Sequence, residues 1–254
     1  MAGPAEGLAA EVLGNRARPD LKWLSKVTGS SPEEVQAALS DLDGHSAFIG
    51  ELASSIAGTG RSYYAQFPAP LDLFALVRLT KPRTLVESGV ASGISSAFML
   101  MGIRSNGGGR LHSIDLPVTR KKGGGNAPWA VPKGKGSGWG IPRALKRGWD
   151  LRIGRSEDRL VPLLKEVGRL DFYCHDSPVD EAHFKFEMKA IVPHLGPGSL
   201  VVADNTEWKI FESTAHAVGA TAFQRKTSGL GAFRVPGIGE VAKGAKVTRR
   251  DRLI

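Results

Sequence analysis

The sequence predicts an α/β fold built on a mostly parallel sheet, and three observations support this. Short apolar runs alternate with helix-like segments from residue 84 onward, which is typical of parallel βαβ units. A glycine-bearing turn joins the first of these runs directly to an apolar helix. The last two runs are separated only by residues 227–231, which is too short for a crossover helix and therefore predicts an antiparallel hairpin.

The first part of the chain, residues 20–58, is expected to be helical. Ser31-Pro-Glu-Glu34 has the capping-box pattern of a helix start, with serine at the N-cap and glutamate three positions later. Helices are predicted at Pro32–Ser40, His45–Ala57 and Leu71–Leu79. We therefore divide the 254-residue chain into a short N-terminal helical extension, residues 1–60, and a sheet domain, residues 61–254.

Seven strands are expected after this extension, six parallel and the last antiparallel, with helices on both faces of the sheet. The strands are Thr84–Ser88, Arg110–Asp115, Asp150–Ile153, Asp171–His175, Ser199–Asp204, Thr221–Lys226 and Ala232–Val235. The helices between them are Ile94–Arg104, Glu157–Glu166, Glu181–Leu195 and Glu207–Val218. This is a Rossmann-like layout, in which ligands bind at the carboxyl ends of the strands.

One long segment, residues 117–142, interrupts this alternation. It is rich in glycine and proline and carries Trp129 and Trp139. A loop of this length in a compact domain is usually a lid or a binding loop. Because it leaves the carboxyl end of the second strand, we expect it to be an active-site loop that contacts a ligand or partner.

Composition is that of an ordinary globular protein, with 41% hydrophobic and 23% charged residues. No apolar run is long enough to span a bilayer, and the N-terminus lacks the pattern of a secretory signal. The lone cysteine, Cys174, excludes an internal disulfide and is expected to pack in a strand. These features favour the cytoplasm and give no reason to expect a membrane partner.

The net charge of +9 is unevenly spread. Residues 120–152 contain nine Lys and Arg side chains against one acid, and residues 1–60 contain eight acids against four bases. A concentrated positive field attracts anionic partners, although a solvated basic surface explains the same pattern. The acidic and basic segments also make a homodimer conceivable.

The turn after the first strand reads Glu87-x-Gly89-x-x-x-Gly93-x-Ser95, and Asp115 ends the next strand 22 residues after Gly93. Glycines let the backbone approach a ligand, and an acid at the next strand end accepts hydrogen bonds from ribose hydroxyls. An acid within the turn would repel a pyrophosphate and suits a ligand with a cationic end. The alternative is an ordinary tight turn without a ligand.

Glu-x-Gly-x-x-x-Gly resembles motif I of the class I methyltransferases that depend on S-adenosylmethionine (SAM). Further stretches resemble the small-molecule O-methyltransferase branch, which is similar to the caffeoyl-CoA and catechol O-methyltransferase group. They are Gly138-Trp-Gly-Ile-Pro142, Leu151-Arg-Ile-Gly-Arg-Ser156, Asp171-Phe-Tyr-Cys-His-Asp-Ser177 and Val192-Pro-His-Leu-Gly-Pro-Gly-Ser-Leu-Val-Val-Ala-Asp-Asn205. The resemblance covers about residues 60–235.

The resemblance implies a set of cofactor-binding residues. Asp115 would bind the ribose hydroxyls, Ser156 would lie near the adenine, and Asp176 would lie beside the methionine moiety and the reacting centre. The methionine part of SAM would be lined by Glu87, Gly89, Ala91, Gly93 and Ser95.

In metal-dependent members of this branch, residues matching Asp176, Asp204 and Asn205 bind a divalent ion. Two carboxylates and an amide oxygen suit Mg²⁺, which would lower the pKa of an acceptor hydroxyl. This chain departs from the branch where Pro178 and Val179 stand in place of a second Asp-His pair. Metal dependence is therefore an open alternative.

Three side chains are candidate catalytic residues: Asp176, His175 and His183. His175 at a strand end is a candidate base, with a structural histidine as the alternative. His183 lies one turn into the helix that follows, at the same edge of the sheet.

The leading hypothesis is a SAM-dependent methyltransferase that acts on a small, anionic acceptor, with oxygen as the expected target atom. A second hypothesis is a nucleic-acid methyltransferase, in which the basic segments and Trp129 and Trp139 would hold RNA. The chain lacks the Asn/Asp-Pro-Pro-Tyr/Phe motif that base-methylating enzymes often carry after the fourth strand. A third hypothesis is a non-catalytic SAM-binding protein in which Pro178 and Val179 reflect lost chemistry.

Overall fold

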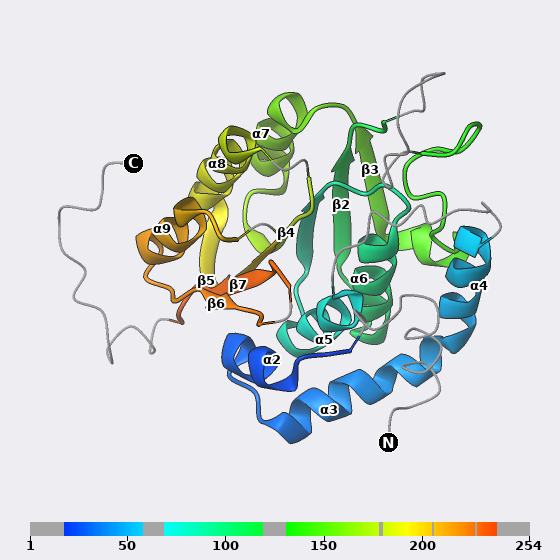
Figure 1. The fold of residues 1–254 in the computed structure, drawn as a ribbon, viewed down its shortest axis with the longest axis horizontal. Helices are drawn as coiled ribbons and strands as arrows, with labels where there is room; N and C mark the ends of the chain where they lie inside the picture. Colours follow the sequence, from blue (N-terminus) through cyan, green and yellow to red (C-terminus); the bar gives the residue numbers. More distant parts are fainter. Residues whose placement is uncertain are drawn as a thin grey trace.

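The computed structural model describes residues 18–57, 69–118, 131–177, 180–204, 206–226 and 228–237. Seven strands form one sheet in the order β3-β2-β1-β4-β5-β7-β6 (Figure 1). Among them β7 runs antiparallel to both of its neighbours. The strands are β1 (Thr84–Ser88), β2 (Arg110–Asp115), β3 (Trp149–Ile153), β4 (Leu170–His175), β5 (Leu195–Ala203), β6 (Phe223–Gln224) and β7 (Gly231–Arg234). The predicted fold class is confirmed.

Helices cover both faces of the sheet, because successive strand residues point to opposite sides. In β1, Leu85 joins one hydrophobic cluster and Val86 joins the other. The first cluster is covered by α2 (Leu21–Thr28), α3 (Pro32–Ser40), α4 (Ser46–Ala57), α5 (Pro70–Thr80) and α6 (Ile94–Ser105). The second is covered by α7 (Ser156–Val167), α8 (Glu181–Ile191) and α9 (Lys209–Ala217), which lie together on the other side of the sheet in Figure 1.

The N-terminal helices pack on the same core as the sheet. Trp23 and Leu24 are buried in the first cluster, and the indole Nε1 of Trp23 donates to the carbonyl oxygen of Phe223 at 2.8 Å. The capping box is present, with Ser31 and Glu34 exchanging hydrogen bonds. The expected boundary at residue 60 lies outside the described residues, so the division into two parts stays a proposal.

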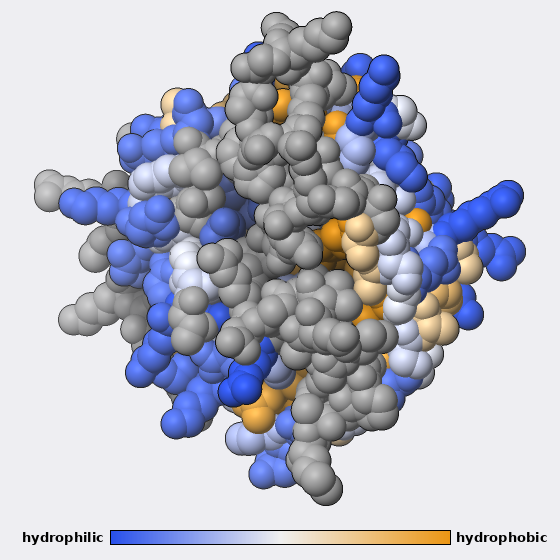
Figure 2. Space-filling view, turned by 45° about the vertical axis from the view of Figure 1, so that its right-hand side comes forward, coloured by the Kyte–Doolittle hydropathy of each residue, from blue (hydrophilic) through white to orange (hydrophobic). Residues whose placement is uncertain are grey.

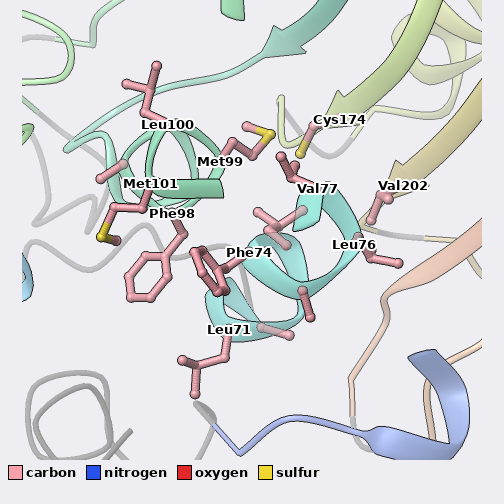
Figure 3. Close-up of a cluster of buried hydrophobic side chains, with 14 of the residues drawn as sticks. Leu71, Phe74, Leu76, Val77, Phe98, Met99, Leu100, Met101, Cys174 and Val202 are labelled. Atoms are coloured by element: carbon pink, nitrogen blue, oxygen red, sulfur yellow. The ribbon is translucent and has the colours of Figure 1, made fainter. Parts of the chain in front are cut away.

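Packing between α5 and α6 is close (Figure 3). A Cβ on Gly102 would lie 2.8 Å from a methyl carbon of Val77, so glycine lets the two helices approach. Phe74, Cys174 and Val202 lie in the same fully buried cluster. The cysteine packs as a small hydrophobic residue, as the sequence predicted.

The largest boundary error concerns the segment between α8 and β5. The sequence predicted one helix to Leu195, but α8 ends at Ile191 and a short 3₁₀ helix, η4 (Val192–His194), follows. Pro193 lies in this turn and cannot supply the backbone donor that a continuing α-helix needs. Two further 3₁₀ helices, η2 (Asp41–His45) and η3 (Arg143–Gly148), were not predicted as such.

On the face shown in Figure 2, the periphery of the described surface is mostly hydrophilic, and hydrophobic surface gathers nearer the middle of the view. Within the described ranges, no helix has the length and apolar character that crossing a membrane would need.

Candidate functional site

The predicted site residues gather at one edge of the sheet. Ser88 pairs with Ile114 of β2 and with His175 of β4, and His175 pairs with Ala203 of β5, so these parallel strands end at the same level. The strand ends carry the four carboxylates that the sequence singled out: Glu87, Asp115, Asp176 and Asp204.

The turn after β1 has the backbone that its glycines predict. Gly89 and Gly93 have φ of 87° and 91°, and Ala91 between them has φ of 45°. A Cβ on Gly89 would lie 1.9 Å from the carbonyl oxygen of Asp176, which only glycine avoids. The turn is therefore pressed against the end of β4, which brings two of the predicted SAM-binding segments together.

Glu87 lies beneath this turn with no exposed surface. Its carboxylate accepts hydrogen bonds from the hydroxyls of Ser95, Ser96 and Ser113 at 2.6, 2.5 and 2.7 Å. Burial raises the pKa of Glu87 to about 7, although these hydroxyls oppose the shift. The side chain thus supports the turn from inside, and the Ser95 hydroxyl is directed to Glu87. Their contact with SAM stays a prediction.

Asp115, the predicted ribose ligand, ends β2 beside the same turn. One carboxylate oxygen accepts from the backbone N–H of Val90 at 3.2 Å, and the other accepts from the hydroxyl of Ser137. Ser137 belongs to the predicted active-site loop. The carboxylate therefore lies where the turn, the strand end and the loop meet.

The longer described part of this loop, residues 131–142, lies directly on the glycine turn. The N–H of Gly138 donates to the carbonyl of Ala91 at 2.8 Å, and that of Gly140 donates to Ser92 at 2.9 Å. A Cβ on Gly93 would lie 2.4 Å from the side chain of Ile141. Residues 119–130, with Trp129, lie outside the described residues.

Asp176 is partly buried at the end of β4, and its backbone N–H donates to Ser88 at 2.8 Å. Burial, followed by the nearby carboxylates of Asp204, Glu87 and Asp115, raises the pKa of Asp176 well above its ordinary value. Asp176 therefore lies within electrostatic reach of the other three acids. The strand-end edge is consequently a strongly acidic environment, which favours a cationic ligand.

The structure describes two of the three expected metal ligands. Asp176 and Asp204 follow neighbouring strands, while Asn205 lies outside the described residues. Within the described ranges, no three His, Cys, Asp or Glu side chains gather in a way that could hold a metal ion. Two carboxylates are compatible with a hard cation but do not by themselves complete a site.

A buried polar network centred on Glu187 of α8 was not predicted. The carboxylate has no exposed surface and accepts from Ser88 Oγ at 2.7 Å, Tyr173 OH at 2.7 Å and His175 Nδ1 at 2.6 Å. His183 Nε2 lies 3.0 Å from its other oxygen. The only sequence signal was the spacing of His183 and Glu187, which are four residues apart and so share a helix face.

The two candidate histidines occupy different positions in this network. His175 is fully buried, with its ring edge against Phe184 at 4.6 Å between centroids. A catalytic role for His175 would thus have to act through Glu187. His183 is partly buried and lies 3.2 Å from the hydroxyl of Ser156, the residue expected near the adenine. The catalytic assignments of both histidines stay predictions.

We compared the chain with family models, with curated proteins and with solved structures. Residues 86–206 match a family model described as a methyltransferase domain. No curated protein gives a significant match to the chain.

Three solved structures have a similar fold. An O-methyltransferase from Bacillus cereus, solved in complex with SAH, is 15% identical, covers 84% of this chain and 96% of its own, and has a TM-score of 0.50. The O-methyltransferase TomG from Streptomyces achromogenes, involved in tomaymycin synthesis and solved with SAM, is 17% identical, with coverages of 74% and 89% and a TM-score of 0.51. A Klebsiella pneumoniae protein provisionally named as an O-methyltransferase is 17% identical, with coverages of 74% and 90% and a TM-score of 0.52.

Proposed function

We propose that the chain is a SAM-dependent methyltransferase that methylates a small, anionic acceptor at oxygen. The match of residues 86–206 to a methyltransferase-domain model and the seven-stranded sheet support this proposal. The observation that supports this best is the acidic edge formed by Glu87, Asp115, Asp176 and Asp204. SAM is a sulfonium with an ammonium group, so carboxylates favour it over a dinucleotide whose pyrophosphate they would repel.

The proposed binding mode follows from the strand-end geometry. Asp115 would accept hydrogen bonds from the ribose hydroxyls, with Ser137 moving to share the carboxylate. The turn Gly89–Gly93 would take the methionine part, with Ala91 offering backbone groups. Leu116 and Ile153, which are exposed beside Asp115, would contact the adenine together with the segment around Ser156. Burying such apolar surface against a base is favourable.

Transfer itself needs alignment and removal of one proton. Bound SAM would supply an electrophilic methyl group for in-line attack by the acceptor oxygen, with S-adenosylhomocysteine as the leaving group, and the strand-end residues would hold the two in line. The acceptor O–H proton goes to a base, and Asp176 suits this task because its raised pKa makes the carboxylate a better proton acceptor. In the alternative with a metal, Asp176, Asp204 and Asn205 would instead hold a divalent ion, which would lower the pKa of the acceptor hydroxyl.

An anionic acceptor is supported by the charge of the loop and the segment that follows it. Lys133 and Lys135 are exposed on the loop that contacts the glycine turn, while the exposed Arg143 and Arg147 belong to η3, which leads to the start of β3. Oxygen as the target is supported by the motifs of the O-methyltransferase branch and by the O-methyltransferases whose folds resemble this one. The same basic residues favour RNA as a second candidate acceptor.

The test is transfer of a radiolabelled methyl group from SAM to matched acceptor panels, with Mg²⁺ and with a chelator. The panels are hydroxyl compounds with and without a carboxylate or phosphate, and an unrelated RNA. Labelling confined to anionic hydroxyl compounds is expected. Labelled RNA would mean that the acceptor is nucleic acid and not a small molecule. SAM binding with no labelling of any panel would favour a non-catalytic role. Loss of labelling with the chelator would support the metal.

A further inference from the structure

The ring of His183 lies between two carboxylates. Its Nδ1 is 3.1 Å from Glu157 Oε1, and its Nε2 is 3.0 Å from Glu187 Oε1. Ionised carboxylates only accept hydrogen bonds, so a carboxylate at each ring nitrogen favours the imidazolium form, in which both nitrogens donate. The side chain is 14% exposed, which limits screening of these pairs by water.

These contacts connect separate elements. Glu157 and Ser156 stand in the first turn of α7, directly after β3, whereas Glu187 and His183 lie on α8. The hydroxyl of Ser177, which directly follows Asp176 at the end of β4, lies 3.0 Å from His183 Nε2. The ring therefore links the start of α7 to the end of β4.

The carboxylate of Glu187 is buried and held in place by several hydrogen bonds. Besides His183 it contacts Ser88, Tyr173 and His175, and none of its surface is exposed. Burial opposes its ionisation, but hydrogen bonds from His175 and His183 outweigh burial and hold the pKa of Glu187 well below its ordinary value. The hydrogen bond between His183 and Glu187 also raises the pKa of His183 to about 9.

We propose that His183 is a positioning residue: its fixed positive charge fastens the β3–α7 turn to the end of β4, and so aligns the adenine side of the SAM site with the methyl-transfer side. This inference rests on the proposed function. A ring that donates from both nitrogens has no lone pair for a proton, so this proposal gives His183 a positioning role instead of the role of general base. The charges facing it are Glu157 from α7, Glu187 from α8 and Asp180 at the N-cap of α8, with Arg155 paired to Glu157.

The first test follows the histidine ring signals by NMR across pH 5–11, with His183 assigned by its loss in His183→Gln. The wild-type ring is expected to titrate near 9. Glu157→Gln should lower that pKa by about one unit. Glu166→Gln is the matched control, because Glu166 lies on the same helix, pairs with Arg152 and is 60% exposed. A wild-type ring that titrates near the ordinary value of about 6.5 would overturn the proposal.

The second test measures SAM affinity by calorimetry at pH 7 and pH 10 for the wild type, His183→Gln and Glu157→Gln. At pH 7 His183→Gln should bind about tenfold more weakly, and Glu157→Gln should lie between the two. At pH 10 the three affinities should converge, because the wild-type ring has lost its charge. The amino group of SAM also titrates between these pH values, and this affects all three proteins alike. The quantity to compare is therefore the ratio of SAM affinities between two proteins at the same pH.

Equal affinity of wild type and His183→Gln at pH 7 would overturn the positioning role. If the wild type binds no SAM at either pH, the proposed function fails instead, and the NMR titration separates that result from a failure of the ion pair. Should His183→Gln not fold, Glu157→Gln gives the same comparison, since Glu157 is a partly exposed residue of a helix surface.

Discussion

Two glycines with similar backbone angles show how surroundings decide what a residue can tolerate. Gly89 and Gly107 have φ of 87° and 74°, a region that costs a residue with a Cβ about 1 kcal/mol or more. A Cβ on Gly89 would strike the backbone of Asp176, whereas a Cβ on Gly107 would meet nothing within 4 Å. The same substitution therefore has different consequences at the two positions.

We expect Gly89→Ala to lower the free energy of unfolding by about 3 kcal/mol or more, since strain and overpacking add. Gly107→Ala should cost only about 1 kcal/mol. Denaturant unfolding followed by circular dichroism measures both. SAM binding should be lost in the first variant and kept in the second. Equal destabilisation would show that the turn does not press on β4.

The residue scale also shows where sequence reasoning ends. The spacing of Glu87, Gly89 and Gly93 predicted the turn, because these signals lie within a few residues. The network around Glu187 joins Ser88 and Tyr173 to α8. Ser88 and Glu187 are 99 positions apart in the sequence. Such contacts depend on how β1, β4 and α8 pack, which no local pattern in the chain encodes.

At the scale of elements, the buried strands were the most predictable part. β1 and β2 have the predicted bounds, because each is a short apolar run bounded by turn residues. The end of α8 was mispredicted because its apolar pattern continues past Ile191 while Pro193 breaks the backbone bonding. The two-residue strand β6 is shorter than predicted, since its pairing is limited to Phe223–Gln224 with β7.

The N-terminal helix α2 provides the prediction at this scale. Leu24 has no exposed surface and lies in the core shared with α5 and α6. Leu24→Ala should lower the free energy of unfolding by about 2–5 kcal/mol through the lost contacts and the cavity. The exposed neighbour Lys22→Ala is the control and should change it by less than about 0.5 kcal/mol.

Thermal unfolding measures these changes, and its shape matters too. One cooperative transition is expected, with its midpoint lowered in Leu24→Ala. A separate early transition, with the main one unmoved, would mean that the helical extension folds independently of the sheet.

At the scale of the whole molecule, stability should depend on the charge of His183. Its folded pKa of about 9 lies above its ordinary value of 6.5, so the stabilisation is complete below pH 6.5 and is lost as pH rises through 9. The difference in unfolding free energy between wild type and His183→Gln should shrink by about 3 kcal/mol over that range. Asp72 and Glu87, whose pKa values are both about 7, are present in both proteins. Their contribution to the pH dependence therefore cancels in the difference between wild type and His183→Gln.

Denaturant unfolding at pH 6 and pH 9.5 measures this difference. Glu157→Gln serves as an intermediate, because it weakens one of the two ion pairs. A difference that is independent of pH would mean that the ring is not charged in the folded protein.

If the acidic strand-end edge binds SAM, calorimetric titration of the protein with SAM should detect the binding, with NAD as the control ligand. We expect micromolar SAM affinity, no NAD binding, and a tenfold to hundredfold loss in Asp115→Ala, because the hydrogen bonds of the ribose to a carboxylate are worth about 1.5–3 kcal/mol. Asp158→Ala, at an exposed position on α7, should bind like the wild type. Absence of SAM binding, or equal affinity of Asp115→Ala and wild type, would show that this edge is not a SAM site.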